Sequence, residues 1–166
     1  MPKKPIAALM LSFIITACTS NQYLVKPDGA ENFSPIKESV FVVNKESTEQ
    51  FSILEKSAIY NLVDPGETDK KLKLVSFGRY PTCGLAYLVS MYTLGLFPVS
   101  TETKHYFIYD LQQGDVTQTY VHDVIVKTRV SIWEWFAKPF TDSEEELFAE
   151  GLSLSKRRLA TDMDSI

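Results

Sequence analysis

The chain has 166 residues, of which 17 are basic and 21 acidic, so its formal net charge is −4 at pH 7, and 45% of its residues are hydrophobic. This length suits one domain with its own hydrophobic core. The acidic balance argues against nucleic-acid binding and against electrostatic docking on anionic lipid. No catalytic, nucleotide-binding or metal-ligand motif stands out in the sequence, so we expect neither a cofactor nor a metal ion.

The first residues have the three parts of an export signal. Lys3 and Lys4 give a basic start, residues 5–17 form an apolar run, and small residues precede Cys18. This order predicts a signal peptide over residues 1–17. The apolar run is shorter than the roughly 20 residues that a membrane-spanning helix needs. An uncleaved anchor and an ordinary secretory signal with a chance cysteine are the alternatives.

The four residues Ile15-Thr16-Ala17-Cys18 resemble the lipobox of bacterial lipoproteins. The resemblance implies cleavage before Cys18, a diacylglycerol group on its sulfur and an acyl chain on its new amino group. Two or three chains give an anchor that does not readily dissociate. An Asp just after the cysteine tends to retain such proteins at the inner membrane. Thr19 stands there instead, which implies the periplasmic face of the outer membrane, with the inner membrane less favoured.

Removal of residues 1–17 leaves 149 of the 166 residues and, without Lys3 and Lys4, changes the net charge from −4 to −6. Residues 18–36 contain prolines, a glycine and many polar residues, which predicts a lipidated tether. Residues 37–166 are then a single domain. The expected partners are the membrane, through the lipid on Cys18, and a second protein of the envelope.

Three elements are predicted at the start of the domain. Residues 38–44 are β-branched and apolar, which indicates a buried strand. Ser47 and Gln50 have the spacing of a capping box, and a helix is predicted from there to Asp64. Residues 70–77 alternate between leucine and lysine, as a partly exposed strand does.

Residues 80–101 contain no charged side chain. Two prolines and two glycines within them make a poor transmembrane helix. A buried helix is the favoured interpretation, while an interfacial or re-entrant element and a membrane span are the alternatives. The segment Thr93-Leu94-Gly95-Leu96-Phe97-Pro98 resembles a Thr-Leu-Gly-apolar pattern in small envelope lipoproteins of the Bor type. That resemblance supports the class and transfers no catalytic residue.

A long hairpin is the clearest β signal. Residues 104–111 and 116–132 flank a turn at 112–115, where Gly114 suits a positive φ. The hairpin leads into residues 132–140, which hold both tryptophans. Packing against the core is the favoured interpretation of these aromatic residues, and contact with lipid headgroups is the alternative. Under the alternative of a membrane contact, the residues predicted to form it are Leu96, Phe97, Trp133, Trp135 and Phe136.

The end of the chain predicts a helix that begins at a capping box of Thr141 and Glu144. Residues 144–146 are acidic and lie at its start, and residues 156–158 are basic and lie at its end, which complements the helix dipole. We expect the basic residues to lie on a solvated face.

Cys83 is the one candidate nucleophile. It is the only thiol left once Cys18 is acylated, so the mature chain cannot form an intramolecular disulfide. With His105 or His122 as base, it is loosely similar to papain-like cell-wall cysteine peptidases. The flanking residues depart from the Asp-Cys-Ser-Gly motif of that class, and a buried, inert thiol is favoured. The two histidines are also predicted to face each other across the hairpin.

The sequence therefore predicts an α+β fold: a small antiparallel sheet with a long hairpin, packed by two or three helices, on an N-terminal lipid tether. The expected function is non-enzymatic, as a structural, accessory or interaction module of the cell envelope. A periplasmic cysteine hydrolase and a membrane-associated subunit that uses residues 80–101 are the alternatives.

Overall fold

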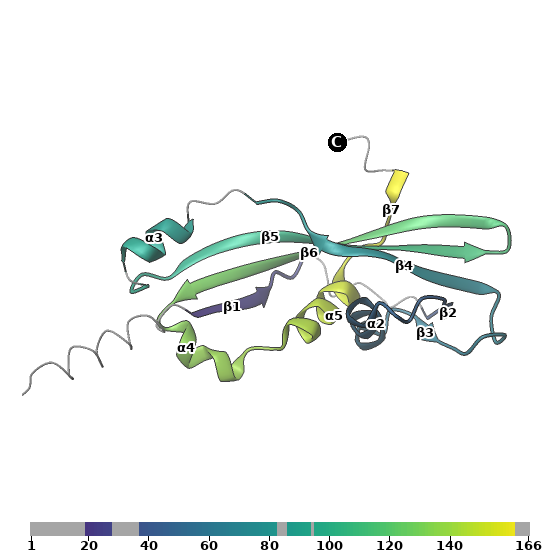
Figure 1. Cartoon of the computed structure of the whole chain (residues 1–166), viewed down its shortest axis with the longest axis horizontal. Helices are drawn as coiled ribbons and strands as arrows, with labels where there is room; N and C mark the ends of the chain where they lie inside the picture. The colour runs from purple at the N-terminus through teal and green to yellow at the C-terminus, as the bar shows by residue number, and fades with distance from the viewer. Residues whose placement is uncertain (1–18, 28–36, 83–85, 94, 162–166) are drawn as a thin grey trace, which may run out of the picture. The chain divides into compact units, whose positions relative to one another are not determined.

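The computed structural model describes residues 19–27, 37–82, 86–93 and 95–161. These residues form an α+β fold in which strands of one sheet are joined in the order β1-β6-β5-β4-β2-β3, with β7 paired to β6 (Figure 1). The strands are β1 Thr19–Leu24, β2 Ser39–Val42, β3 Asn61–Leu62, β4 Lys70–Arg79, β5 Val99–Gln113, β6 Val116–Ser131 and β7 Arg158–Leu159. The helices are α2 Thr48–Ser57, α3 Ala86–Tyr92, α4 Glu134–Ala137, the 3-10 turn η2 Lys138–Phe140 and α5 Glu144–Leu154.

The sheet is mixed, which corrects the predicted antiparallel sheet. β2 runs parallel to both β3 and β4, whereas β4 and β5 are antiparallel, with Leu72 opposite Leu111. The parallel pairs arise because α2 lies between β2 and β3 in the chain and reverses its direction. The α+β class, the long hairpin and the packing by helices are confirmed.

The chain divides into two compact units. Unit 1 comprises residues 1–23, 81–102 and 127–141, and unit 2 comprises residues 24–80, 103–126 and 142–166. β5 and β6 contribute residues to both units. Each unit is described by itself below.

The hydrophobic core lies in unit 2. Its buried side chains come from α2, α5 and the strands, and they include Leu54, Leu72, Tyr109, Val126 and Leu152. In β4, Leu72 and Leu74 are buried while Lys71 and Lys73 are exposed, as the alternating pattern predicts. α2 packs against α5 and closes one side of this core.

α2 is shorter than the sequence predicts. It ends at Ala58, which adopts a left-handed conformation with φ 51°, and its N–H donates to the Glu55 carbonyl. Asn61 and Leu62 then pair with β2 as β3. Continuation of the helix to Asp64 was the wrong expectation, because sheet pairing takes over a segment whose periodicity still fits a helix.

The hairpin is confirmed at its turn. β5 ends at Gln113, β6 begins at Val116, and Gly114 has φ +59°. On β6, Tyr120, Val124 and Val126 are buried together, as their alternation predicts.

α5 begins two residues later than predicted. Ser143 caps it, and its hydroxyl and the Glu146 backbone and side chain form the capping box that was expected at Thr141 and Glu144. Of the basic residues after α5, Lys156 is exposed as expected, whereas Arg157 and Arg158 are partly buried and contact protein groups. Arg157 lies 4.2 Å above the Tyr120 ring, and Arg158 in β7 forms an ion pair with Asp123.

β1 lies within the range for which a tether is predicted. Thr19–Leu24 form a strand that pairs with β6, so the start of the predicted tether is part of the sheet. Cys18, the remainder of the tether at 28–36 and Cys83 lie outside the described residues.

Candidate functional site

The charge-free segment is not the buried helix that the sequence favours. Its only described helix is α3, and there Leu88, Val89 and Tyr92 are exposed by 48%, 51% and 88%. Beyond α3, Leu96 and Phe97 are also more than half exposed. Within the described ranges no helix has the length and apolar character needed to cross a bilayer.

The tryptophan-bearing segment is exposed as well, so the expected packing against the core is wrong. Trp133, Trp135 and Phe136 are exposed by 57%, 61% and 64%, and Phe140 by 88%. The rings of Trp135 and Phe136 contact each other edge to face with centroids 5.1 Å apart. α4 has only four residues, which is too short a helix to bury these rings in a core.

Two hydrogen bonds join the segment after α3 to the segment that begins α4. The indole Nε1 of Trp133 donates to the Leu96 carbonyl at 3.1 Å, and the Ile132 N–H donates to the Gly95 carbonyl at 3.0 Å. The two exposed segments therefore form one substructure. We call it the aromatic surface and define it by its exposed side chains, Tyr92, Leu96, Phe97, Trp133, Trp135, Phe136 and Phe140.

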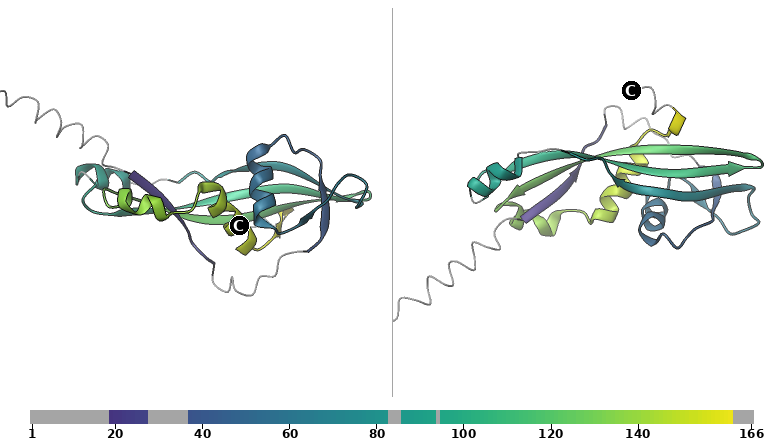
Figure 2. Two further views of the ribbon diagram at one scale, coloured as in Figure 1. Left: turned by 90° about the horizontal axis from the view of Figure 1, so that it is seen from below. Right: turned by 45° about the horizontal axis from the view of Figure 1, so that its top comes forward.

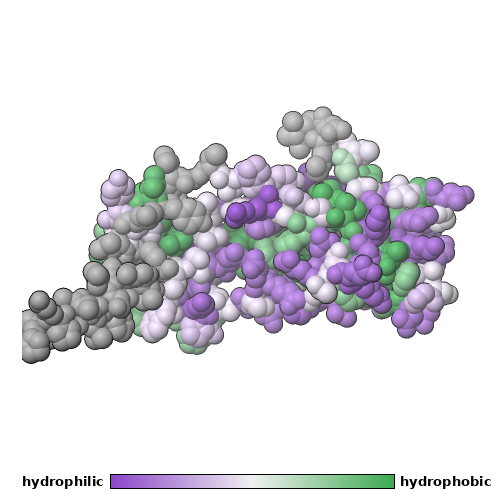
Figure 3. Space-filling model, viewed as in Figure 1, coloured by the Kyte–Doolittle hydropathy of each residue, from purple (hydrophilic) through white to green (hydrophobic). Residues whose placement is uncertain are grey.

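The described side chains of unit 1 have an inverted distribution of polar and apolar residues. Nine of the fourteen large hydrophobic side chains exposed in the described residues belong to it, including every exposed aromatic one. Among the unit 1 side chains whose burial the structure describes, the buried ones are polar, and they are Asn21, Ser90, Ser131 and Glu134. Figure 3 shows hydrophobic surface over α3 and, in paler green, over α4. Exposed apolar side chains gathered in one unit in this way are typical of a contact with a partner or a membrane.

Glu134 fastens β1 to the start of α4. Its carboxylate is 3% exposed and accepts hydrogen bonds from the Tyr23 hydroxyl at 2.7 Å and from the Asn21 side chain at 3.0 Å. Its backbone carbonyl accepts a second bond from Asn21 at 2.7 Å, and Arg129 Nε lies 3.4 Å from the carboxylate. Burial and the Glu134 carboxylate raise the pKa of Tyr23. Figures 1 and 2 both show that β1 begins beside α4.

The sequence pattern did not single out Glu134, Asn21 or Tyr23. Glu134 lies between two tryptophans at the start of a predicted aromatic stretch, and Asn21 lies in a predicted tether. A carboxylate and an amide more than 100 positions apart give no local signal, and only the pairing of β1 with β6 brings them together.

The charges of unit 1 differ from those of the rest of the chain. Its described residues carry three basic side chains, Lys127, Arg129 and Lys138, against the acidic Glu102 and the buried Glu134. Lys127 and Arg129 line a hollow of about 400 Å³ together with Tyr23, Pro98 and the first residues of β5, Val99 and Ser100. The whole chain is acidic, so unit 1 should repel anionic groups less than unit 2 does.

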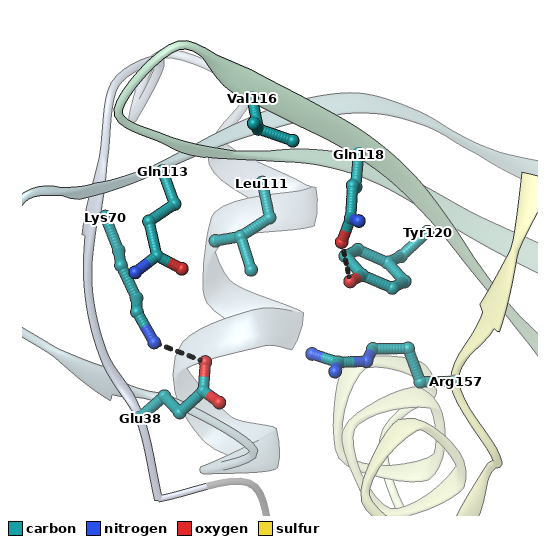
Figure 4. A pocket seen from close by; sticks show the side chains of 8 residues that line it. All are labelled: Glu38, Lys70, Leu111, Gln113, Val116, Gln118, Tyr120 and Arg157. Carbon is teal, nitrogen blue, oxygen red and sulfur yellow. Dashed lines mark hydrogen bonds and ion pairs between the residues drawn. The ribbon is translucent and has the colours of Figure 1, made fainter.

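Unit 2 contains a second polar hollow, of about 490 Å³ (Figure 4). Most of its charged and polar side chains are already paired with protein groups. Lys70 forms an ion pair with Glu38 at 3.1 Å, the Tyr120 hydroxyl donates to Gln118, and Arg157 donates to the Tyr60 hydroxyl. Figure 4 shows the lining side chains, which come from the hairpin, from Lys70 at the start of β4, from Glu38 before β2 and from Arg157 after α5. Paired groups of this kind offer little to a ligand.

Arg157 begins a buried chain of hydrogen bonds in unit 2. It donates to Tyr60 at 3.0 Å, the Tyr60 and Tyr109 hydroxyls are 2.9 Å apart, and Tyr109 lies 3.3 Å from His122 Nε2. His122 Nδ1 is 2.7 Å from the Ser155 hydroxyl, which donates to the Leu152 carbonyl. If His122 is neutral with its proton on Nδ1, each group in this chain donates to the next one, from Arg157 to the Leu152 carbonyl.

The two histidines have separate surroundings. Burial and the nearby Arg157 lower the pKa of His122 to about 4. The His105 ring packs against Phe148 and Phe77, with centroids 4.7 Å and 6.3 Å away, and its pKa is lowered by burial and by Arg79. His122 is thus a core residue with both ring nitrogens engaged, and the predicted pairing of the histidines is replaced by these contacts. The proposed pairing with Cys83 concerns a residue outside those described.

Among the residues that the structure describes, no group of three histidine, cysteine or acidic side chains is arranged to hold a metal ion. The fold and these surfaces define an α+β protein with a buried core in unit 2 and an exposed aromatic surface in unit 1. The chain matches no known protein family and no curated protein.

Proposed function

We propose that this chain is a cell-envelope lipoprotein that is cleaved before Cys18, acylated there and held on the periplasmic face of the outer membrane. The observation that carries the proposal is the position of the lipobox-like Ile15-Thr16-Ala17-Cys18, directly before the first strand of the fold. A signal that ends where the sheet begins leaves the folded part complete after cleavage. In this proposal the apolar run of residues 5–17 is the central part of the export signal.

The role proposed for the folded part is non-enzymatic, as a structural or interaction module. Three features support this. Most polar side chains of the unit 2 hollow are paired with other protein groups, His122 is buried within a complete hydrogen-bond chain, and the most unusual surface is apolar. Such features are typical of binding and assembly, whereas an active site presents unpaired reactive groups.

The proposal is tested by the mass and the location of the mature protein. Intact-mass analysis of the protein extracted from envelopes should show a chain that starts at Cys18 and carries a diacylglycerol and an acyl group. Cys18→Ala should accumulate as an uncleaved precursor, and an inhibitor of the lipoprotein signal peptidase should have the same effect. Separation of the two membranes on a density gradient should recover the mature protein with the outer membrane.

Cys83→Ala is the matched control, because it removes the other thiol and should leave processing unchanged. A mature chain that begins at another residue, or one that lacks lipid, would rule out the proposal. Recovery of the acylated protein with the inner membrane would overturn only its assignment to the outer membrane.

A further inference from the structure

We propose that the aromatic surface of unit 1 inserts into the headgroup layer of the same bilayer that holds the lipid anchor. Unit 1 is then a second, non-covalent membrane contact that fixes how the protein stands on the membrane. This inference rests on the proposed acylation of Cys18. It concerns a different set of residues, and it is tested by a different measurement.

The first argument is the short distance between anchor and fold. Cys18 immediately precedes Thr19, the first residue of β1, and one residue spans at most about 3.8 Å between Cα atoms. β1 is in turn bonded to Glu134 through Asn21 and Tyr23. Acyl chains on Cys18 therefore keep the start of α4 close to the bilayer, because no flexible linker separates them.

The second argument is the composition of unit 1. Among its described side chains, the tryptophans and phenylalanines are exposed and Asn21 and Glu134 are buried, the reverse of the distribution in a water-soluble fold. Tryptophan is enriched at membrane interfaces, where its ring contacts acyl chains and its N–H has a polar partner. Trp133 already has that partner, because its Nε1 donates to the Leu96 carbonyl. Its ring can therefore enter an apolar layer without an unsatisfied donor.

The third argument is charge. Lys138 directly follows α4 and is exposed, so its long side chain can keep its ammonium group among the headgroups. Lys127 and Arg129 line the hollow next to Pro98, which continues directly from Phe97. Lys138 and Lys127 suit lipid phosphates, while Arg129 is paired with Glu134. The remaining residues of the mature chain are acidic overall and are repelled by such phosphates. The short helices fit a protein that lies on the bilayer, with insertion of about 5–10 Å.

Both tryptophans of the chain belong to the aromatic surface, so tryptophan fluorescence reports on it directly. The acylated protein is purified in detergent and reconstituted into phosphatidylethanolamine and phosphatidylglycerol vesicles that contain spin-labelled lipid. We expect loss of most of the tryptophan emission with a label near the headgroups, less loss with a label at the bilayer centre, and protection from the aqueous quencher acrylamide. Emission that resists both lipid labels while acrylamide quenches it would refute the inference and would leave the surface for a protein partner.

Matched variants locate the effect. Phe136→Ser together with Phe140→Ser should reduce the quenching by lipid several-fold, because both side chains are exposed and neither is needed for the core of unit 2. Val43→Ser with Val75→Ser removes exposed apolar side chains from unit 2 and should leave the quenching unchanged. Equal effects of the two pairs would contradict a role of this particular surface.

The failure of the proposed function can be told apart from the failure of this inference. If intact mass shows no lipid on Cys18, the mature chain is added to the same vesicles without an anchor. Quenching by the headgroup label would then still support contact through the aromatic surface. Its absence would refute that contact too.

Discussion

Acidification should destabilise unit 2 through His122, and the sign follows from its pKa. Burial and Arg157 lower the pKa of His122 to about 4 in the folded chain, against a usual value of 6.5. The unfolded chain thus takes up the proton first as the pH falls. The contribution to stability is complete above pH 6.5 and is lost as the pH falls toward 4.

The magnitude follows from the two pKa values. A full shift of this size corresponds to about 3 kcal/mol in the free energy of unfolding, of which about 2 kcal/mol is lost between about pH 7 and about pH 5. The structural cause is the direction of the hydrogen bonds. Protonation of Nε2 would set an N–H against the Tyr109 hydroxyl, which can donate there only to a neutral ring.

The assay is urea unfolding of the chain at a series of pH values from 5 to 8. His122→Gln keeps a side chain that can form hydrogen bonds but does not titrate, so its stability should change less over this range, whatever its absolute value. His105→Gln is the control. His105 is only half-buried, and its lowered pKa should supply a smaller slope of the same sign. Equal pH dependence in the original chain and in His122→Gln would refute the reasoning.

Two further substitutions test the packing of the two units. Gly151→Ala should lower the stability of unit 2 by about 1–3 kcal/mol despite the higher helix propensity of alanine, because the new Cβ would collide with Val124 Cγ1. Ser153→Ala on the same helix is the control in urea unfolding, and a Gly151→Ala chain as stable as the original would show that the helix can shift. Glu134→Ala should lower the stability of unit 1 by about 2–3 kcal/mol, because the buried Asn21 amide and the partly buried Tyr23 hydroxyl lose the carboxylate that accepts from them. Amide hydrogen exchange of β1 should then accelerate while Glu102→Gln leaves it unchanged, and unaltered exchange in the Glu134→Ala chain would contradict the role of this carboxylate.

Local patterns in the sequence determined the elements that depend on neighbouring residues. The turn at Gly114 and the long hairpin follow from β-branched alternation around a residue that suits a positive φ. The alternation of leucine and lysine determined which face of β4 is buried. The acidic first turn of α5 was also predictable, although its cap proved to be Ser143, because neighbouring polar residues compete for one capping position.

Only the tertiary structure decided which elements pair with each other and which apolar side chains remain exposed. The parallel pairing of β2 with β3 and β4 overrode the helical periodicity that continues after Ala58. The composition of the segment near Trp133 predicted that its aromatic residues pack in the core. They are exposed because α3 and α4 are short helices with no described apolar layer against them. Glu134 illustrates the reason: its hydrogen bonds join positions far apart in the chain, and no local pattern records such a contact.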